Sequence, residues 1–154
     1  MVDQALQVGQ LGIAPFSYSG EEFYSQKVIT FAATAIGTYP LFTVTGAVAF
    51  KITAICTATI IPTVAGATIS VGTPALATNI IGLTTGANLS IGEIWFAAAP
   101  ATVINTVATG QLQFIIGDGA DINLYVATQA ITSGEIVFTL LWHPLTPGAN
   151  IVAA

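Results

Sequence analysis

The chain has 154 residues and a mass of 15.7 kDa, a size that fits one domain with a single core. Only 6% of its residues are charged, against about 25% in an ordinary soluble domain. The net charge is −5 and the sequence contains no arginine, which excludes the basic surface that binding to DNA or RNA requires.

The hydrophobic content is high for a free monomer, at 54% with a mean hydropathy of +0.83. Large exposed apolar patches usually mark interaction sites, so we expect neighbouring proteins to cover part of this surface. A membrane helix is the competing explanation, and its best candidate is Leu41 to Ile61. Lys51 near the middle of that segment and its period-2 alternation argue against a spanning helix. We therefore expect no membrane partner.

Residues 1–26 differ in pattern from the rest of the chain. Glycine and proline interrupt a stretch that holds the aromatic residues Phe16, Tyr18, Phe23 and Tyr24. This pattern predicts an extended N-terminal arm, which either docks on a neighbouring subunit or folds back as an edge strand of its own domain. No basic residue precedes the first apolar positions, so no secretory signal is expected and synthesis is expected in the cytoplasm.

Residues 27–154 carry the signature of an all-β domain. β-branched and aromatic residues recur in short runs bounded by Gly, Pro, Asn and Thr, and none of these runs has a helical stripe. Their spacing predicts an antiparallel β-sandwich or jelly-roll-like domain. The expected strands are 28–34, 41–45, 48–57, 67–71, 79–83, 93–97, 111–116, 121–127 and 135–143.

The run from Val48 to Ala54 shows the clearest alternation. Val48, Phe50 and Ile52 share one face, and Lys51 and Thr53 share the other, which predicts a half-buried strand. Cys56, the single cysteine, follows in the same run and is expected to be a buried, unreactive thiol. Residues 117–121 contain an Asp-Gly pair between two apolar runs and predict a tight turn, while residues 97–109 are expected to form a loop.

Few side chains are available for catalysis. The chain has one histidine, one cysteine, two lysines and seven carboxylates, and His143 lies between Trp142 and Pro144, where an interface or capping role fits better than general-base chemistry. No serine lies in a Gly-x-Ser-x-Gly motif and no glycine-rich phosphate loop is present. Asp118 and Asp121 supply too few ligands for calcium, and one histidine and one cysteine are too few for zinc. We expect a protein that is not an enzyme and needs no cofactor.

The C-terminal region carries a resemblance. The strand from Gly134 to His143, the turn from Pro144 to Ala149 and the tail from Asn150 to Ala154 resemble the closing segment of small capsid-decoration or head-fibre-like proteins of tailed bacteriophages. Residues 41–46 end in Thr45-Gly46 and lead into the next long strand. This entry is similar to the Thr-Gly entry into a strand in those proteins. The resemblance implies a virion protein, made in the host cytoplasm, that binds the major capsid protein on the outer capsid surface as a homotrimer.

Three functions are consistent with these features. The first is a capsid decoration protein that stabilises the shell through contacts between subunits. The second is a tail-associated or surface carbohydrate-binding module that uses Trp95, Tyr125 and Trp142 as stacking platforms, although burial of both tryptophans is expected from their apolar neighbours. The third is a capsid or pilin-like subunit that forms a lattice by itself. The candidate interface residues are Phe16, Tyr18, Phe23, Tyr24, Trp142, His143, Ile151 and Val152.

Overall fold

The computed structural model describes residues 22–96, 112–117 and 120–154. In these residues the chain is almost entirely β, as predicted, and all the strand pairs are antiparallel. Within the same residues a single 3₁₀ turn, η1 (Gly86–Asn88), accompanies the strands. Among the described residues no helix is long and apolar enough to cross a membrane.

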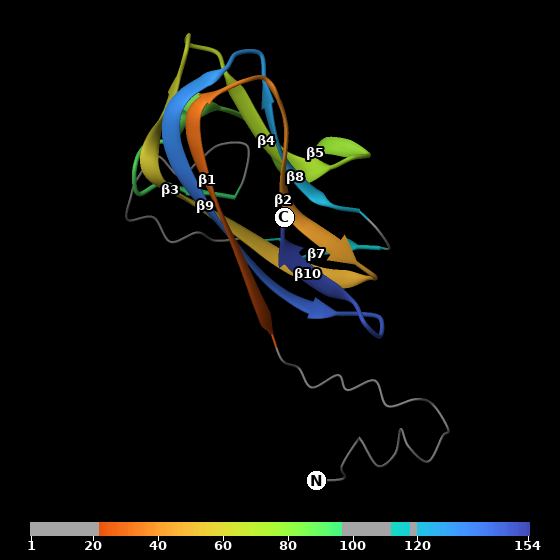
Figure 1. Ribbon diagram of the computed structural model, residues 1–154. Helices are drawn as coiled ribbons and strands as arrows, with labels where there is room; N and C mark the ends of the chain where they lie inside the picture. The colour runs from red at the N-terminus through yellow and green to blue at the C-terminus, as the bar shows by residue number, and fades with distance from the viewer. Residues whose placement is uncertain (1–21, 97–111, 118–119) are drawn as a thin grey trace, which may run out of the picture.

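The strands of the described residues form two five-stranded sheets that lie against each other as two layers (Figure 1). Sheet A has the order β1-β9-β3-β6, and β7 also pairs with β3; its strands are β1 (Phe23–Thr34), β9 (Ile131–Pro144), β3 (Val48–Pro62), β6 (Ile94–Trp95) and β7 (Phe114–Ile116). Sheet B has the order β10-β2-β8-β4-β5; its strands are β10 (Asn150–Ala153), β2 (Gly37–Thr45), β8 (Ile122–Ala127), β4 (Thr68–Thr73) and β5 (Leu76–Thr85). The expected β-sandwich is confirmed.

The core is one cluster of side chains drawn from both sheets. In β3, Phe50, Ile52, Ala54 and Cys56 are buried, and Lys51 points away from the core. The predicted alternation of this strand is therefore confirmed. Burial of each large apolar side chain contributes about 1.5–3 kcal/mol, and the largest fully buried ones include Trp95, Phe42, Phe50, Phe138 and Leu41.

The strand boundaries differ from the predictions at several places. β1 begins at Phe23, so the last residues of the predicted arm 1–26 pair with β9 as an edge strand. The strand expected at 93–97 shortens to Ile94–Trp95. β10 is not predicted by the sequence, because four residues carry too short a pattern and pairing with β2 holds them in place. Residues 1–21, the loop 97–109 and Asp118-Gly119 of the predicted turn lie outside the described residues.

Candidate functional site

Six of the eight candidate interface residues lie in three neighbouring strands. Phe23 and Tyr24 begin β1, Trp142 and His143 lie near the end of β9, and Ile151 and Val152 belong to β10. Phe23 is the register partner of Trp142, and their rings stack with centroids 4.8 Å apart. Phe16 and Tyr18 lie outside the described residues. The fold therefore places these six residues on neighbouring strands, but Tyr24 faces away from the core while Trp142 and Ile151 are buried, and their role in an interface stays a prediction.

The edges of the two sheets are joined where β1 passes β10, and we call this junction the β1–β10 seam. The indole Nε1 of Trp142 donates to Ser25 Oγ at 3.0 Å, and Ser25 Oγ donates to the carbonyl oxygen of Ile151 at 2.8 Å. Lys27 Nζ also donates to the carbonyl oxygen of Ala154. Since Ser25 and Lys27 belong to sheet A and their acceptors lie in or beside β10, these bonds hold the two sheets together.

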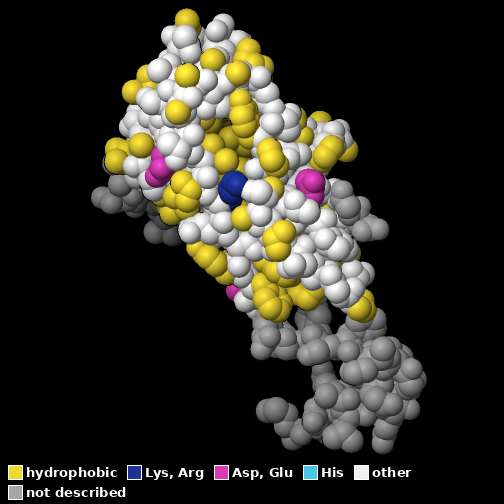
Figure 2. Space-filling view, in the orientation of Figure 1, with side chains coloured by type: hydrophobic (Ala, Val, Ile, Leu, Met, Phe, Trp, Pro, Cys, Tyr) yellow, Lys and Arg dark blue, Asp and Glu magenta, His cyan; other side chains and the backbone are white. Residues whose placement is uncertain are grey.

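Burial divides five of the six described candidate residues into two groups, and the sixth, His143, is half-buried. Trp142 and Ile151 are buried, at 5% and 2% exposed, so they support the seam from inside. Phe23, Tyr24 and Val152 are exposed and are available to a neighbouring protein. In the orientation of Figure 1, the surface is mostly hydrophobic and uncharged polar, with widely separated charged groups (Figure 2). Such a surface has little electrostatic repulsion to oppose contact with another protein.

A larger candidate surface, which the sequence did not single out, is the side of sheet A that faces away from the core. We call it the outer face of sheet A. The register of β1, β9 and β3 sets the residues that share it. They are Tyr24, Gln26, Val28 and Thr30 of β1, Glu135, Val137, Thr139 and Leu141 of β9, and Lys51, Thr53, Ile55 and Thr57 of β3. In the sequence, the alternation around Lys51 and Thr53 indicates one strand of this face. Which residues of β1 and β9 lie beside that strand becomes known only from the strand pairing.

The outer face exposes more apolar area than a solvated sheet face usually does. Tyr24 is 59% exposed, Val28 47% and Leu141 42%, and Ile55 is exposed as well. A sheet with one solvated face normally alternates apolar residues inside with polar residues outside. Here large apolar side chains occupy both faces of the same strands, and this pattern is typical of a sheet that contacts something on each side.

Glu135 is held in a defined position on this face. Its Oε1 accepts a hydrogen bond from Thr57 Oγ1 at 2.7 Å, and its Oε2 accepts one from Thr30 Oγ1 at 2.9 Å. These bonds, first that from Thr57 and then that from Thr30, hold the pKa of the carboxyl below its ordinary value, because they stabilise the ionised form. At neutral pH the face therefore presents a fixed negative charge.

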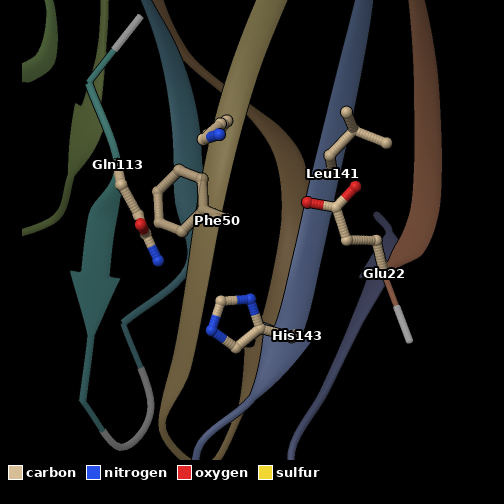
Figure 3. Close-up of a pocket in the computed structure, with 6 residues that line it drawn as sticks. Glu22, Phe50, Gln113, Leu141 and His143 are labelled. Atoms are coloured by element: carbon tan, nitrogen blue, oxygen red, sulfur yellow. The ribbon is translucent and has the colours of Figure 1, made fainter. Parts of the chain in front are cut away.

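A shallow pocket lies at the other end of the outer face (Figure 3). Its lining residues are Glu22, Phe50, Lys51, Gln113, Leu141 and His143. Gln113 and Glu22 lie on opposite sides, with Phe50, Leu141 and His143 between them (Figure 3). The pocket mixes charged, polar and apolar groups in a small space, so it fits a protein side chain better than a drug-sized ligand, whose pockets are deeper and mostly apolar.

The described residues do not assemble a recognisable metal site. No group of three or more His, Cys, Asp or Glu side chains within them is arranged to hold a metal ion. Cys56 is buried, as predicted. Burial, and then the negative charge of Glu93, raise the pKa of its thiol, which disfavours the thiolate that acts as a nucleophile.

The aromatic residues considered as carbohydrate platforms are engaged inside the fold. Trp95 is fully buried, its Nε1 donates to Thr84 Oγ1 at 2.9 Å, and its ring meets Phe138 edge-on. Tyr125 donates its hydroxyl hydrogen to the carbonyl oxygen of Thr73 at 2.8 Å. The expected burial of Trp95 and Trp142 is confirmed. Neither indole ring offers the open face that stacking against a sugar requires.

Comparison with known proteins yields no relative. No protein-family model, no curated protein and no solved structure matches the chain. The resemblance of the C-terminal segment to phage decoration proteins therefore stays a prediction.

Proposed function

We propose that this chain is a structural subunit that acts by packing against other protein subunits, and that it is a decoration protein of a virus capsid. The observation that carries the proposal is the outer face of sheet A. Tyr24, Val28 and Leu141 are exposed there, although their strands already bury a complete core on the opposite side. Contact with other subunits removes such apolar area from water.

The composition supports the same proposal. With 6% charged residues, the chain has few groups that must remain hydrated, so wide areas of its surface tolerate burial in an assembly. Burying charged side chains without partners is costly, whereas threonine-rich surfaces lose less on contact. The described residues also include two long edge strands, β1 and β5, whose free hydrogen-bonding groups are shielded by assembly.

The capsid is the assembly that the C-terminal resemblance favours. The proposed partners are other copies of the chain, as a trimer, and the major capsid protein of the same virion. The proposed location is the outer capsid surface, where bridging adjacent capsid subunits adds stability. Catalysis has no part in this function, since the side chains gathered at the seam and the outer face bind and pack.

The first test is the mass of the purified chain, measured by size-exclusion chromatography with multi-angle light scattering. A defined oligomer is expected at micromolar concentrations. A stable monomer that fails to bind any shell contradicts the proposal. Electron microscopy of the same sample separates decoration from lattice formation, because shells or filaments made by this chain alone indicate a subunit that builds the lattice.

The second test locates the chain in a particle. Virus particles assembled with and without the chain are imaged by cryo-microscopy, and extra density on the outer capsid surface is expected only where the chain is present. Particles lacking the chain are expected to release their contents at a lower temperature. Identical density and identical thermal stability in the two preparations would count against a decoration role.

A further inference from the structure

β1 is a long edge strand whose pairing is regular. β9 lies along one side of it (Figure 1), and their register runs without a shift from Phe23 to Ala32. No strand of the described residues pairs with the other side of β1. The other edge strands in that part of the chain are short or irregular: β6, β7 and β10 have two, three and four residues, and the register of β5 with β4 shifts twice. Because short and bulged strands protect a sheet edge, β1 is the edge best suited to accept another strand.

The backbone groups of β1 that point away from β9 belong to alternate residues. The N–H of Ala32 donates to Thr34 Oγ1 at 3.3 Å, so it points to the free side and not to β9. Because the direction of the N–H and C=O groups repeats every two residues along a strand, Gln26, Val28 and Thr30 direct theirs to the free side as well. The side chains of these three residues are exposed. They therefore form a row of hydrogen-bonding groups that another strand can reach.

Lys27 does not guard this edge. A lysine on an edge strand commonly keeps other strands away, but the side chain of Lys27 turns toward sheet B, where its Nζ donates to the carbonyl oxygen of Ala154. The seam bond from Ser25 to Ile151 is likewise made by a side chain. Both side chains lie on the inner side of β1, and neither bond uses the backbone of residues 26–30.

We propose that two copies of this chain join edge to edge through β1, so that sheet A continues from one copy into the other. The two strands run antiparallel about a two-fold axis that is perpendicular to the sheet and passes between the two Val28 residues. Val28 then lies opposite Val28 of the second copy, and Gln26 lies opposite Thr30. Two strands in this register share about six main-chain hydrogen bonds.

Charge and backbone geometry select this register over its neighbours. An axis at Lys27 would place the two Lys27 side chains directly opposite each other, and like charges in that position are destabilising. An axis nearer the end of β1 would need the N–H of Ala32, which already donates to Thr34. The axis at Val28 avoids both conflicts. On the outer face it also sets valine against valine and the glutamine amide against the threonine hydroxyl.

A second copy is the occupant that β1 indicates. A two-fold interface is isologous, so each copy must present a surface that complements itself. An antiparallel pair of identical strands meets this condition through its backbone. Val28, which is 47% exposed, is covered by its equivalent, and the outer faces of the two copies become one continuous apolar surface. The pairing therefore enlarges the surface on which the proposed function depends.

The charged groups of the outer face do not oppose this pair. Glu22, Lys51 and His143 line the pocket beyond the Gln26 end of the paired segment, and the nearest stretch of the second copy, residues 31–37, has no charged residue. Three strand spacings, about 14 Å, separate the two copies of Glu135. That distance exceeds the Debye length of about 8 Å at physiological salt, so their repulsion is screened.

The inference rests on the proposed function, because both require self-association. A trimer formed through other surfaces is compatible with it, since pairing through β1 would then join two trimers.

Disulfide formation tests the register. In a Cys56→Ala background, Val28→Cys places two thiols opposite each other with their Cα atoms about 5.5 Å apart, a separation that a disulfide spans. Mild oxidation at micromolar concentrations is expected to give a covalent dimer. Gln26→Cys in the same background is the matched control, because the two copies of residue 26 are about 14 Å apart, and it should stay uncrosslinked. Mixing Gln26→Cys chains with Thr30→Cys chains is expected to crosslink one to the other.

A proline substitution tests the backbone hydrogen bonds. The N–H of Val28 faces the free side, and proline is tolerated at such a position of an edge strand. Val28→Pro removes two hydrogen bonds from the pair, so association measured by sedimentation velocity should weaken roughly tenfold or more. Val28→Thr, which keeps the N–H and the branched shape, should associate like the wild type. Circular dichroism and thermal melting establish that each variant is folded, and the cysteine variants decide if Val28→Pro is not.

The outcomes separate this inference from the proposed function. A folded Val28→Pro variant that associates like the wild type, or Gln26→Cys chains that crosslink as fast as Val28→Cys chains, overturns pairing through β1. A chain lacking residues 1–19 is expected to crosslink through Val28→Cys as the full chain does, and loss of the crosslink overturns the pairing in favour of a strand supplied by the arm. An oligomeric wild type leaves the proposed function standing in all these cases. A wild-type chain that stays monomeric and binds no shell overturns both.

Discussion

The indole nitrogen of Trp142 and the hydroxyl of Ser25 lie 3.0 Å apart, and the same hydroxyl donates its hydrogen to the carbonyl oxygen of Ile151. The Ser25 hydroxyl thus accepts a hydrogen bond from a residue of β9, a central strand of sheet A, and donates one to a residue of β10, an edge strand of sheet B. The bonds are partly buried, so water competes with them less than at an open surface. The Ser25 side chain is therefore expected to contribute measurably to the stability of the seam.

Ser25→Ala is expected to destabilise the fold by about 1–3 kcal/mol, because it leaves the Trp142 N–H and the Ile151 carbonyl without this partner. The measurement is equilibrium unfolding in guanidinium chloride followed by tryptophan fluorescence. Ser133→Ala, at a half-buried position of β9 that pairs with β1, is the matched control, with an expected change within about 0.5 kcal/mol. Equal stability of the two variants would show that the seam bonds contribute nothing measurable.

Glu135 gives a prediction for pH. Hydrogen bonds from Thr57 and then Thr30 lower the pKa of its carboxyl in the folded chain, so the ionised form stabilises the fold. That contribution is complete above the ordinary carboxyl pKa and is lost as the pH falls through the lowered value. Glu135→Gln should therefore flatten the acidic limb of the curve of stability against pH.

The same prediction has a direct spectroscopic check. In a carbon-detected NMR titration, Thr57→Val is expected to raise the Glu135 pKa more than Thr30→Val does, because the bond from Thr57 has the larger effect. Thr139→Val, on the same strand and face as Glu135, is the control and should leave that pKa unchanged. A Glu135 pKa that is the same in all three variants contradicts the assignment.

The sequence predicted the features that depend on local alternation. The faces of the strand around Phe50 and Lys51 follow from a period of two residues, and so does the burial of Cys56. The seam could not be predicted in this way, because the Ser25 hydroxyl meets Ile151 across 126 residues of sequence. The distance between the two residues is set by how the sheets pack, which no short pattern specifies.

The outer face of sheet A shows the same limit. Alternation in the sequence places Lys51 and Thr53 on one side of their strand, and the structure agrees. That Leu141 and Tyr24 extend the row of Lys51 depends on the pairing of β3, β9 and β1, and a shift of one residue would turn Leu141 toward the core. The apolar character of the face therefore becomes visible only once the register is known.

Gly134 in β9 marks a close approach between β9 and β3. Its φ is +135°, and an added Cβ would lie 2.5 Å from Ile60 Cδ1 and 2.9 Å from the carbonyl oxygen of Thr59. Gly134→Ala is expected to cost about 2–4 kcal/mol from backbone strain and overpacking combined. At Gly117 an added Cβ meets nothing within 4 Å, so Gly117→Ala should change stability by no more than about 0.5 kcal/mol. Thermal and chemical unfolding of the two variants compare these costs.

The thiol of Cys56 tests how firmly the sandwich is closed. It is 1% exposed, and its Sγ donates to the carbonyl oxygen of Ala58 at 3.0 Å. Burial and then the charge of Glu93 raise the pKa of the Cys56 thiol, so the thiolate is scarce at neutral pH. A disulfide reagent such as dithiobis(nitrobenzoate) therefore reacts with Cys56 only when the fold opens. The reaction rate should therefore rise with guanidinium chloride in step with unfolding.

In a Cys56→Ala background, Val152→Cys places a thiol at an exposed position of β10 and should react at once. If Cys56 reacts as fast as that control in native buffer, β3 opens without global unfolding and the core is less cooperative than its packing implies.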